Sequence, residues 1–380
     1  MNLSSEQAAV RDVVREFAAE ELRPVARECD EEQRFPEDVW DGLAELDLTG
    51  LTVPEEYGGY DADPVTYAII NEELAHGMLS VATALSVHGL ATSCIDEFGT
   101  QDVRDEWLPE MVDGRPVGAF ALSEPEAGSN PAEMSTVAER EGDEFVLNGK
   151  KQWITNGNRA GVYVVFAKTD RDDPGSITQF LVPADTDGVS VGKKEDKLGL
   201  RASDTTTLIF EDARIPAEYQ LTEEGRGLSA AFQILTGGRI AIGAQSVGLA
   251  QAALDAAVEY AQQREQFEQP IADFQAIRHK LAEMQTKVTA GRLLTREAAQ
   301  KKAEGAGMET AFLASQAKYF ASEAAMDVTN EAVQIHGGYG YTTDFPVERF
   351  YRDAKILTIY EGTTQIQKKI IARHLLGDDA

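Results

Sequence analysis

The order of sequence patterns along this chain limits its fold more than any single motif does. Helical periodicity comes first, a run of strand-like segments follows, and helical periodicity then returns and holds almost to the end. The strand-like segments are short, rich in β-branched and aromatic residues, and separated by Gly, Asp, Asn and Pro. We therefore predict an N-terminal α-helical domain over 1–116, a middle β domain over 117–222 and a C-terminal helical domain over 223–380.

The patterns within each predicted domain indicate its architecture. In the first domain, apolar residues recur at helical spacing in 5–22, 64–77 and 79–98. In the middle domain, runs such as VYVVFAKT and ITQFLVPA predict a compact antiparallel sheet or barrel. In the third, the stretch beginning GRIAIGAQ is followed by helical regions near 273–304, 307–335 and 346–374, which predict a four-helix bundle. The fold class is thus multidomain α+β.

The charge balance excludes some partners. The chain has 65 acidic and 35 basic residues, a formal net charge of −30. Such a balance argues against nucleic acid or an anionic membrane as a partner, because both repel it. The acidic residues are spread along the chain, which indicates a solvated acidic surface, and we interpret that surface as an adaptation to high salt.

The interpretation predicts how stability responds to salt. Ions at molar concentration screen charges over a few ångströms, so they remove most of the self-repulsion of an acidic surface. We therefore expect the unfolding temperature to rise between dilute buffer and molar KCl. A temperature that stays constant or falls would contradict the interpretation.

Targeting and metal signals are weak in this sequence. No apolar run approaches the roughly 20 residues of a membrane helix, and the N-terminus lacks the basic and apolar segments of a signal peptide. Cys29 and Cys94 lack metal-ligand spacing, and none of the five histidines is paired at such a spacing. We therefore expect no membrane insertion, no metal site and a cytoplasmic location.

Two segments of the middle domain combine glycine, polar and aromatic residues. In FALSEPEAGSN (120–130), hydroxyls and backbone N–H groups could bind a polar ring edge or a phosphate, although the local pattern favours an ordinary turn. In KQWITNG (151–157), Trp153 and Thr155 alternate with Ile154 and so share one face of a strand. That face suits a flat aromatic cofactor, and a core tryptophan fits the pattern equally well.

A third segment, DAKILTIYEGTTQIQ (353–367), contains a candidate base. Glu361 ends an apolar run and precedes Gly362, so partial desolvation would raise the pKa of its carboxyl group toward the range of a general base. The alternative is an acid at the start of a helix, because Thr363 and Thr364 are good capping residues. The local pattern alone favours this alternative.

Taken in order, seven segments resemble the acyl-CoA dehydrogenase family over essentially the whole chain. They are FALSEPEAGSN, KQWITNG, KLGLRASDT, GGRIAIGAQSVGLAQAALD, REQFEQPIADFQAIRHKLAEM, QIHGGYGY and RDAKILTIYEGTTQIQ. The resemblance implies the α, β, α domain order, FAD as cofactor, a homotetramer arranged as a dimer of dimers, and a role in fatty-acid β-oxidation or branched-chain amino-acid catabolism. It also points to the branch that carries its base near the C-terminus.

The resemblance also implies roles for individual residues. Part of the FAD site would be formed by a neighbouring subunit. Arg264 and Gln275 correspond to the residues that hold FAD across that subunit interface. The residues implied to bind FAD are Phe120, Leu122, Ser123, Ser129, Trp153, Ile154, Thr155, Arg264, Phe267, Gln275, Gln334, Gly337, Gly338, Thr363 and Gln365. The residues implied to contact the acyl-CoA substrate are Ser129, Arg239 and Gly362.

The implied reaction is α,β-dehydrogenation of an acyl-CoA to the trans-2-enoyl-CoA. Glu361 would remove the α-proton, flavin N5 would accept the β-hydride, and an electron-transferring flavoprotein would reoxidise the enzyme. Two alternatives stay open: an acyl-CoA oxidase, which shares the fold and the base but uses oxygen, and a non-enzymatic helical scaffold or acyl-binding protein. The short chain with a single bundle argues against the oxidase.

Three positions bear on how far the resemblance extends. Thr236 stands where many relatives have an acid, which puts contacts at the adenine end in doubt. Glu268 replaces the glycine of the usual RxxFGxP motif, near the expected FAD phosphates. Gly238 occupies the place where isovaleryl-specific relatives carry their base, so this chain is expected to use Glu361.

Overall fold

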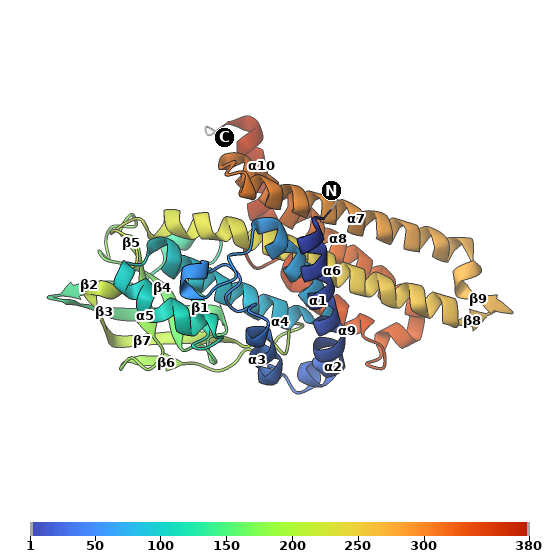
Figure 1. The fold of residues 1–380 in the computed structure, drawn as a ribbon, viewed down its shortest axis with the longest axis horizontal. Helices are drawn as coiled ribbons and strands as arrows, with labels where there is room; N and C mark the ends of the chain where they lie inside the picture. The colour runs from blue at the N-terminus through green and yellow to red at the C-terminus, as the bar shows by residue number, and fades with distance from the viewer. Residues whose placement is uncertain (1–2, 378–380) are drawn as a thin grey trace.

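A computed structural model describes residues 3–377; residues 1, 2 and 378–380, at the outer ends of the first and third predicted domains, lie outside that range. The strands of the main sheet gather at one end of an elongated molecule, and long helices extend from there toward the other end (Figure 1). The helices before the sheet are α1 (Ser5–Phe17), α2 (Arg23–Glu31), α3 (Glu37–Glu45), α4 (Pro64–Phe98) and α5 (Gln101–Val112). The helices after it are α6 (Gly227–Gln263), α7 (Gln275–Ala303), α8 (Met308–His336), α9 (Val347–Leu357) and α10 (Thr364–Leu376).

The long central helix α4 is kinked where the two predicted helical stretches meet. Met78 has φ −157° and ψ 107°, an extended conformation inside an otherwise continuous helix. Gln245 of α6 bridges the kink, because its Nε2 donates to Asn71 Oδ1 at 2.9 Å on one side and to the Ala82 carbonyl at 3.1 Å on the other. The kink is therefore held by α6 rather than left to solvent.

Helix α4 also bears on the expectation about membranes. Among the described residues it is the one helix long and apolar enough to cross a bilayer, but 83% of its most apolar stretch is buried inside the protein. The sequence-based expectation that no apolar stretch approaches the length of a membrane helix is therefore wrong. The burial itself is typical of the core helix of a globular domain.

The middle of the chain forms one curled sheet of seven strands within residues 3–377. Its strands are β1 (Gly118–Ala121), β2 (Val137–Glu141), β3 (Glu144–Thr155), β4 (Val162–Lys168), β5 (Ile177–Pro183), β6 (Val189–Val191) and β7 (Thr205–Pro216). Most pairings are antiparallel, as predicted, but β1 and β2 both run parallel to β4. Strand β2 is absent from the predicted runs because its second half, Glu139 to Glu141, is exposed and charged.

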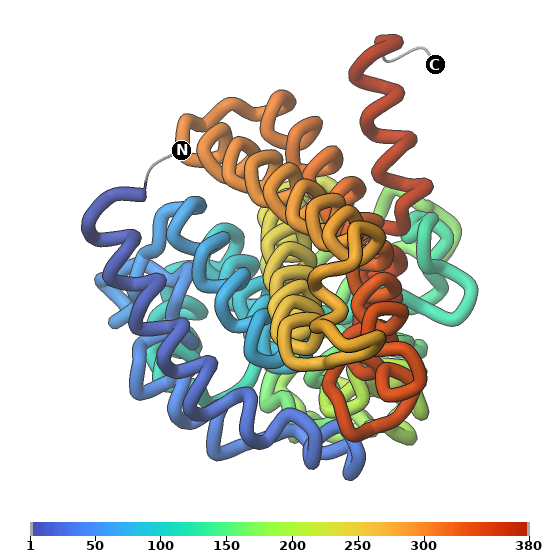
Figure 2. Tube along the Cα trace, turned by 90° about the vertical axis from the view of Figure 1, so that its right-hand side faces the viewer, coloured from blue at the N-terminus to red at the C-terminus, as the bar shows by residue number. Residues whose placement is uncertain are grey.

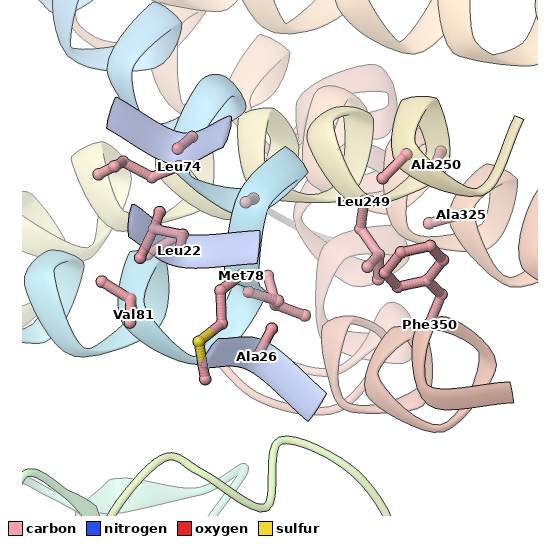
Figure 3. Close-up of a cluster of buried hydrophobic side chains, with 14 of the residues drawn as sticks. Leu22, Ala26, Leu74, Met78, Val81, Leu249, Ala250, Ala325 and Phe350 are labelled. Carbon is pink, nitrogen blue, oxygen red and sulfur yellow. The ribbon is translucent and has the colours of Figure 1, made fainter. Parts of the chain in front are cut away.

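The C-terminal helices lie side by side as a bundle, seen end-on in Figure 2, and the last helix projects from the body. Their shared core continues into the N-terminal helices without a break. Figure 3 shows Met78 of α4 beside Leu22 and Ala26, and Leu249 of α6 beside Phe350 of α9. The bundle and the first domain thus form one hydrophobic core, to which the sheet is attached along α4 and α6.

The last predicted helical region, 346–374, is interrupted in the structure. Helix α9 ends at Leu357 and α10 begins at Thr364, with Thr363 as its cap. In the interruption, Glu361 and Gly362 have φ of 53° and 86°, both in the left-handed region. A residue other than glycine with such a φ costs on the order of 1–3 kcal/mol, so the surrounding structure must hold it in place.

Candidate active site

A cavity of about 570 Å³, which we call the main cavity, opens between the sheet and the helices. Its walls come from α4, α6, the loop after β1, the end of β3 and the turn between α9 and α10. Eleven residues singled out in the sequence line it: Phe120, Leu122, Ser123, Ser129, Trp153, Ile154, Thr155, Arg239, Glu361, Gly362 and Thr363. All three segments that combine polar and aromatic residues therefore meet at one site.

The carboxyl group of Glu361 lies in this cavity in a desolvated position. Its Oε2 is buried and has no hydrogen-bond partner among residues 3–377. Burial raises the pKa of Glu361 to about 7, and the positive charges of Arg239 and Lys318 oppose that rise. An uncoordinated carboxylate with a pKa near neutrality is suited to accept a proton from a bound molecule.

Helix α6 makes room for this carboxyl group at a glycine. A β-carbon added at Gly238 would lie 3.0 Å from Oε2 of Glu361 and 3.5 Å from Cδ2 of Leu90. Glycine inside a helix costs about 1 kcal/mol of stability relative to alanine. The close approach of Glu361 explains why a glycine stands here, because any side chain would crowd the carboxyl group. The next residue, Arg239, is also buried, and its Nε has no partner among the described side chains.

Trp153 forms a wall of the main cavity through a distortion of its strand. The register between β3 and β7 slips between Lys151 and Ile154, which places an extra residue in β3, and Trp153 has φ 64°. The side chain of Trp153 is 60% exposed, whereas Ile154 is buried. Simple alternation along a regular strand does not describe this segment, although Trp153, Ile154 and Thr155 all line the cavity.

The loop that follows β1 is fixed by a buried ion pair. Lys151 Nζ lies 2.8 Å from Glu124 Oε1, both side chains are buried, and the same ammonium donates to the Leu122 carbonyl at 3.2 Å. Glu124 also accepts bonds from the backbone N–H and hydroxyl groups of Ser135 and Thr136. Burial tends to raise the pKa of Glu124, but Lys151 and these donors lower it to about 2.

A second group of the predicted residues lies at the far end of the bundle. Arg264, Gly337 and Gly338 line a separate cavity of about 480 Å³, which we call the far cavity. It adjoins the hairpin of β8 (Glu265–Gln266) and β9 (Gln269–Pro270), at the end of the molecule opposite the sheet (Figure 1). Within a single chain, these three residues therefore lie away from the main cavity.

Four other predicted residues also lie away from the main cavity. Phe267 is 87% exposed at the tip of the hairpin, where Phe267 and Glu268 have φ of 54° and 67°. Glycine is favoured at such positions, so Glu268 stands at a site that suits the glycine it replaces. Gln275, Gln334 and Gln365 are exposed at the start of α7, the end of α8 and the first turn of α10.

Lys318 and Leu90 belong to the surroundings of Glu361 but are missing from the predicted residues. Lys318 is fully buried on α8, and its ammonium bonds to the Gly362 carbonyl. A lysine whose buried neighbours on the same helix are alanine and serine was the signal that could have found it. Leu90 lies on the apolar face of α4, where no local signal distinguishes it from a core residue.

The chain matches three family models, which together span most of its length. Residues 4–115 match the acyl-CoA dehydrogenase N-terminal domain, residues 119–213 the middle domain and residues 225–376 the C-terminal domain. Among curated proteins, the mitochondrial short-chain specific acyl-CoA dehydrogenase of Rattus norvegicus is 46% identical over 369 residues, which cover 97% of this chain and 89% of the relative.

Two solved structures are similar over nearly their whole length. Butyryl-CoA dehydrogenase from Megasphaera elsdenii superposes with a TM-score of 0.96 at 41% identity, covering 99% of this chain and 100% of the other. A chain from a study of the electron transferring flavoprotein of Acidaminococcus fermentans also gives a TM-score of 0.96, at 42% identity and 99% coverage of each chain.

Proposed function

The chain belongs to the acyl-CoA dehydrogenase family, and from that premise we propose that it converts a short acyl-CoA to the trans-2-enoyl-CoA with Glu361 as its base. As a member of the family it is an oxidoreductase that acts on acyl-CoA. One observation carries the assignment of the base: a desolvated carboxyl group with an unpartnered oxygen faces the main cavity.

The family consists of FAD flavoproteins, and FAD is the cofactor of this enzyme. The main cavity fits a flavin, because it combines the exposed indole of Trp153 with the hydroxyl-bearing residues Ser123 and Thr155 and an apolar interior. We propose that the fifteen residues implied by the resemblance hold FAD, with Trp153 covering the ring. When bound, FAD supplies the acceptor for the β-hydride of the substrate.

The remaining roles follow from positions around Glu361. The carboxylate takes the α-proton, and the backbone N–H of Glu361, which makes no hydrogen bond to another described residue, can donate to the thioester oxygen. A donor aimed at that oxygen stabilises the enolate charge that develops as the proton leaves. Ser129 and Gly362 would contact the thioester arm, and Arg239, which is buried beside Glu361, would contact the acyl-CoA near its reacting carbons rather than at its nucleotide.

A short acyl group is supported by the wall behind Glu361. Leu90 lines both the main cavity and a second one of about 280 Å³, which we call the side cavity. Because Gly238 brings Leu90 and Glu361 close together, an acyl chain that presents its α-carbon to the base soon meets Leu90. The names of the rat and M. elsdenii relatives agree with a short substrate.

Two partners complete the proposal. A homotetramer would bring the far cavity of one subunit to the cofactor of another, which accounts for the distance between Arg264 and Trp153 within one chain. An electron-transferring flavoprotein is proposed as the electron acceptor, and the A. fermentans structure supports that choice. The cytoplasmic location expected from the sequence stays a prediction.

The pKa of Glu361 predicts how the rate depends on pH. Below about pH 7 the carboxyl group is protonated and cannot accept the α-proton, so kcat/KM should fall about tenfold for each further unit of acidification. The measurement is kcat/KM for butyryl-CoA across this range, with the unfolding temperature followed in parallel to show that the protein stays folded. A flat profile through pH 7 would contradict the assignment.

The reaction itself is tested with straight and branched acyl-CoAs in molar salt. We expect a short acyl-CoA to reduce an electron-transferring flavoprotein or a dye and to yield the trans-2-enoyl-CoA. Hydrogen peroxide produced in proportion to product would instead identify an acyl-CoA oxidase. A purified protein that holds no flavin, even after FAD is added, would favour a binding protein or scaffold.

A further inference from the structure

Lys318 is a buried cation to which the proposed reaction assigns no role. It lies in the middle of α8, its side chain is fully enclosed, and its buried neighbours on the same helix are alanine and serine residues. Lysine is almost never fully buried unless its charge has a partner, because removing the ammonium from water is costly. Its position therefore calls for a reason.

The hydrogen bond of Lys318 is made to the turn that carries the proposed base. Its Nζ donates to the Gly362 carbonyl at 2.7 Å. From α10, Gln367 Nε2 donates to the Glu361 carbonyl at 3.1 Å and to the Gly362 carbonyl at 2.9 Å. Glu361 and Gly362 both have left-handed backbone conformations, so donors from α8 and α10 hold a turn that would otherwise relax.

The charge of Lys318 also acts on the carboxyl group of Glu361. Burial raises the pKa of that carboxyl group, and Arg239 of α6 and Lys318 of α8 are the charges that oppose the rise. Burial lowers the pKa of Lys318 to about 8, and Glu361 opposes that fall. The other titratable groups that face this pair are Tyr67 of α4, Tyr360 of the turn and Glu323 of α8.

We propose that Lys318 is a positioning residue for the dehydrogenation: it fixes the Glu361–Gly362 turn through the Gly362 carbonyl, and its enclosed positive charge favours the carboxylate form of Glu361. The proposal rests on the proposed role of Glu361 as the base. It assigns to one side chain both the geometry and the ionisation of the proton acceptor, although that side chain lines none of the walls of the main cavity.

The test compares variants that separate charge from hydrogen bonding. Lys318→Met removes both, Lys318→Gln keeps a donor without the charge, and Gln367→Met removes the uncharged donor that α10 supplies to the turn. The holoenzymes are assayed with butyryl-CoA as a function of pH. Both Lys318 variants should shift the acid limb of kcat/KM upward by about one unit, and so lose about tenfold in activity below the limb. Gln367→Met should lower kcat without moving the limb.

Lys287→Met is the matched control, because Lys287 makes a surface ion pair with Asp327 on the outside of the bundle. It should leave both the limb and the rate unchanged. An acid limb at the wild-type pH in Lys318→Gln overturns the proposal, and so does an equal shift in Gln367→Met. If Lys318→Met does not fold, Lys318→Gln alone decides. A wild-type profile without a limb defeats the role of Glu361 itself, so the two failures are distinguishable.

Discussion

Glu361→Gln should lower kcat by roughly 10²–10⁴-fold, the usual contribution of a positioned general base, while FAD and acyl-CoA still bind. The amide has nearly the shape of the carboxylate, so the packing against Gly238 survives, but it cannot accept the α-proton. Turnover is measured with butyryl-CoA. Flavin content and the spectral change on binding product report whether the site is intact.

Glu97→Gln is a suitable control for this variant, because Glu97 is an exposed acid that lines the side cavity, away from Glu361. It makes the same chemical change at a position that the proposal leaves without a role, and its kcat should match that of the wild type. Glu361→Gln turning over within a few-fold of the wild type would remove Glu361 as the base. A variant without FAD would instead reveal a structural defect.

Lys151→Met should destabilise the protein by about 3–5 kcal/mol, because removing one partner leaves Glu124 as an uncompensated buried charge. The loss should also release the Leu122 carbonyl at the edge of the main cavity and reduce FAD occupancy. The measurements are denaturant unfolding of the middle domain and flavin content after purification.

Lys150→Met is the matched control for this prediction, since Lys150 is the exposed neighbour on the same strand. It should change stability by less than about 0.5 kcal/mol. Adding Glu124→Gln to Lys151→Met should recover part of the loss, because a neutral amide replaces the buried carboxylate. Equal stability of Lys151→Met and Lys150→Met would show that the ion pair contributes little.

The long helices and most strands could be predicted because their apolar patterns are local, whereas α2, α3 and α5 lie outside the predicted helical stretches. The boundary between the predicted helical stretches 64–77 and 79–98 falls at Met78, where α4 kinks. Strand β2 was not predicted, because its pairing with β3, rather than an apolar pattern of its own, makes it a strand. The break between α9 and α10 was not predicted, because helical periodicity continues through it. Contacts from other helices hold the left-handed turn there.

The candidate site was less predictable, since its chemistry depends on neighbours distant in sequence. On local pattern Glu361 resembles an acid at a helix start, and Thr363 does cap α10. What makes Glu361 a candidate base is the enclosure of its Oε2 beside Gly238, on a helix more than 100 positions earlier. Trp153 illustrates the same limit, because the bulge that places it at the cavity arises from the register of β3 against β7.

The wall between the main and side cavities separates two properties of the enzyme. The proposed proton abstraction depends on the turn between α9 and α10, whereas the room behind that turn is limited by Leu90, a single side chain on α4. A smaller residue at this one position would join the two cavities without altering a hydrogen bond of the Glu361 turn. Under the proposed function, a substitution of Leu90 alone would therefore change the length of acyl chain that fits, and the residues of the Glu361 turn would stay the same.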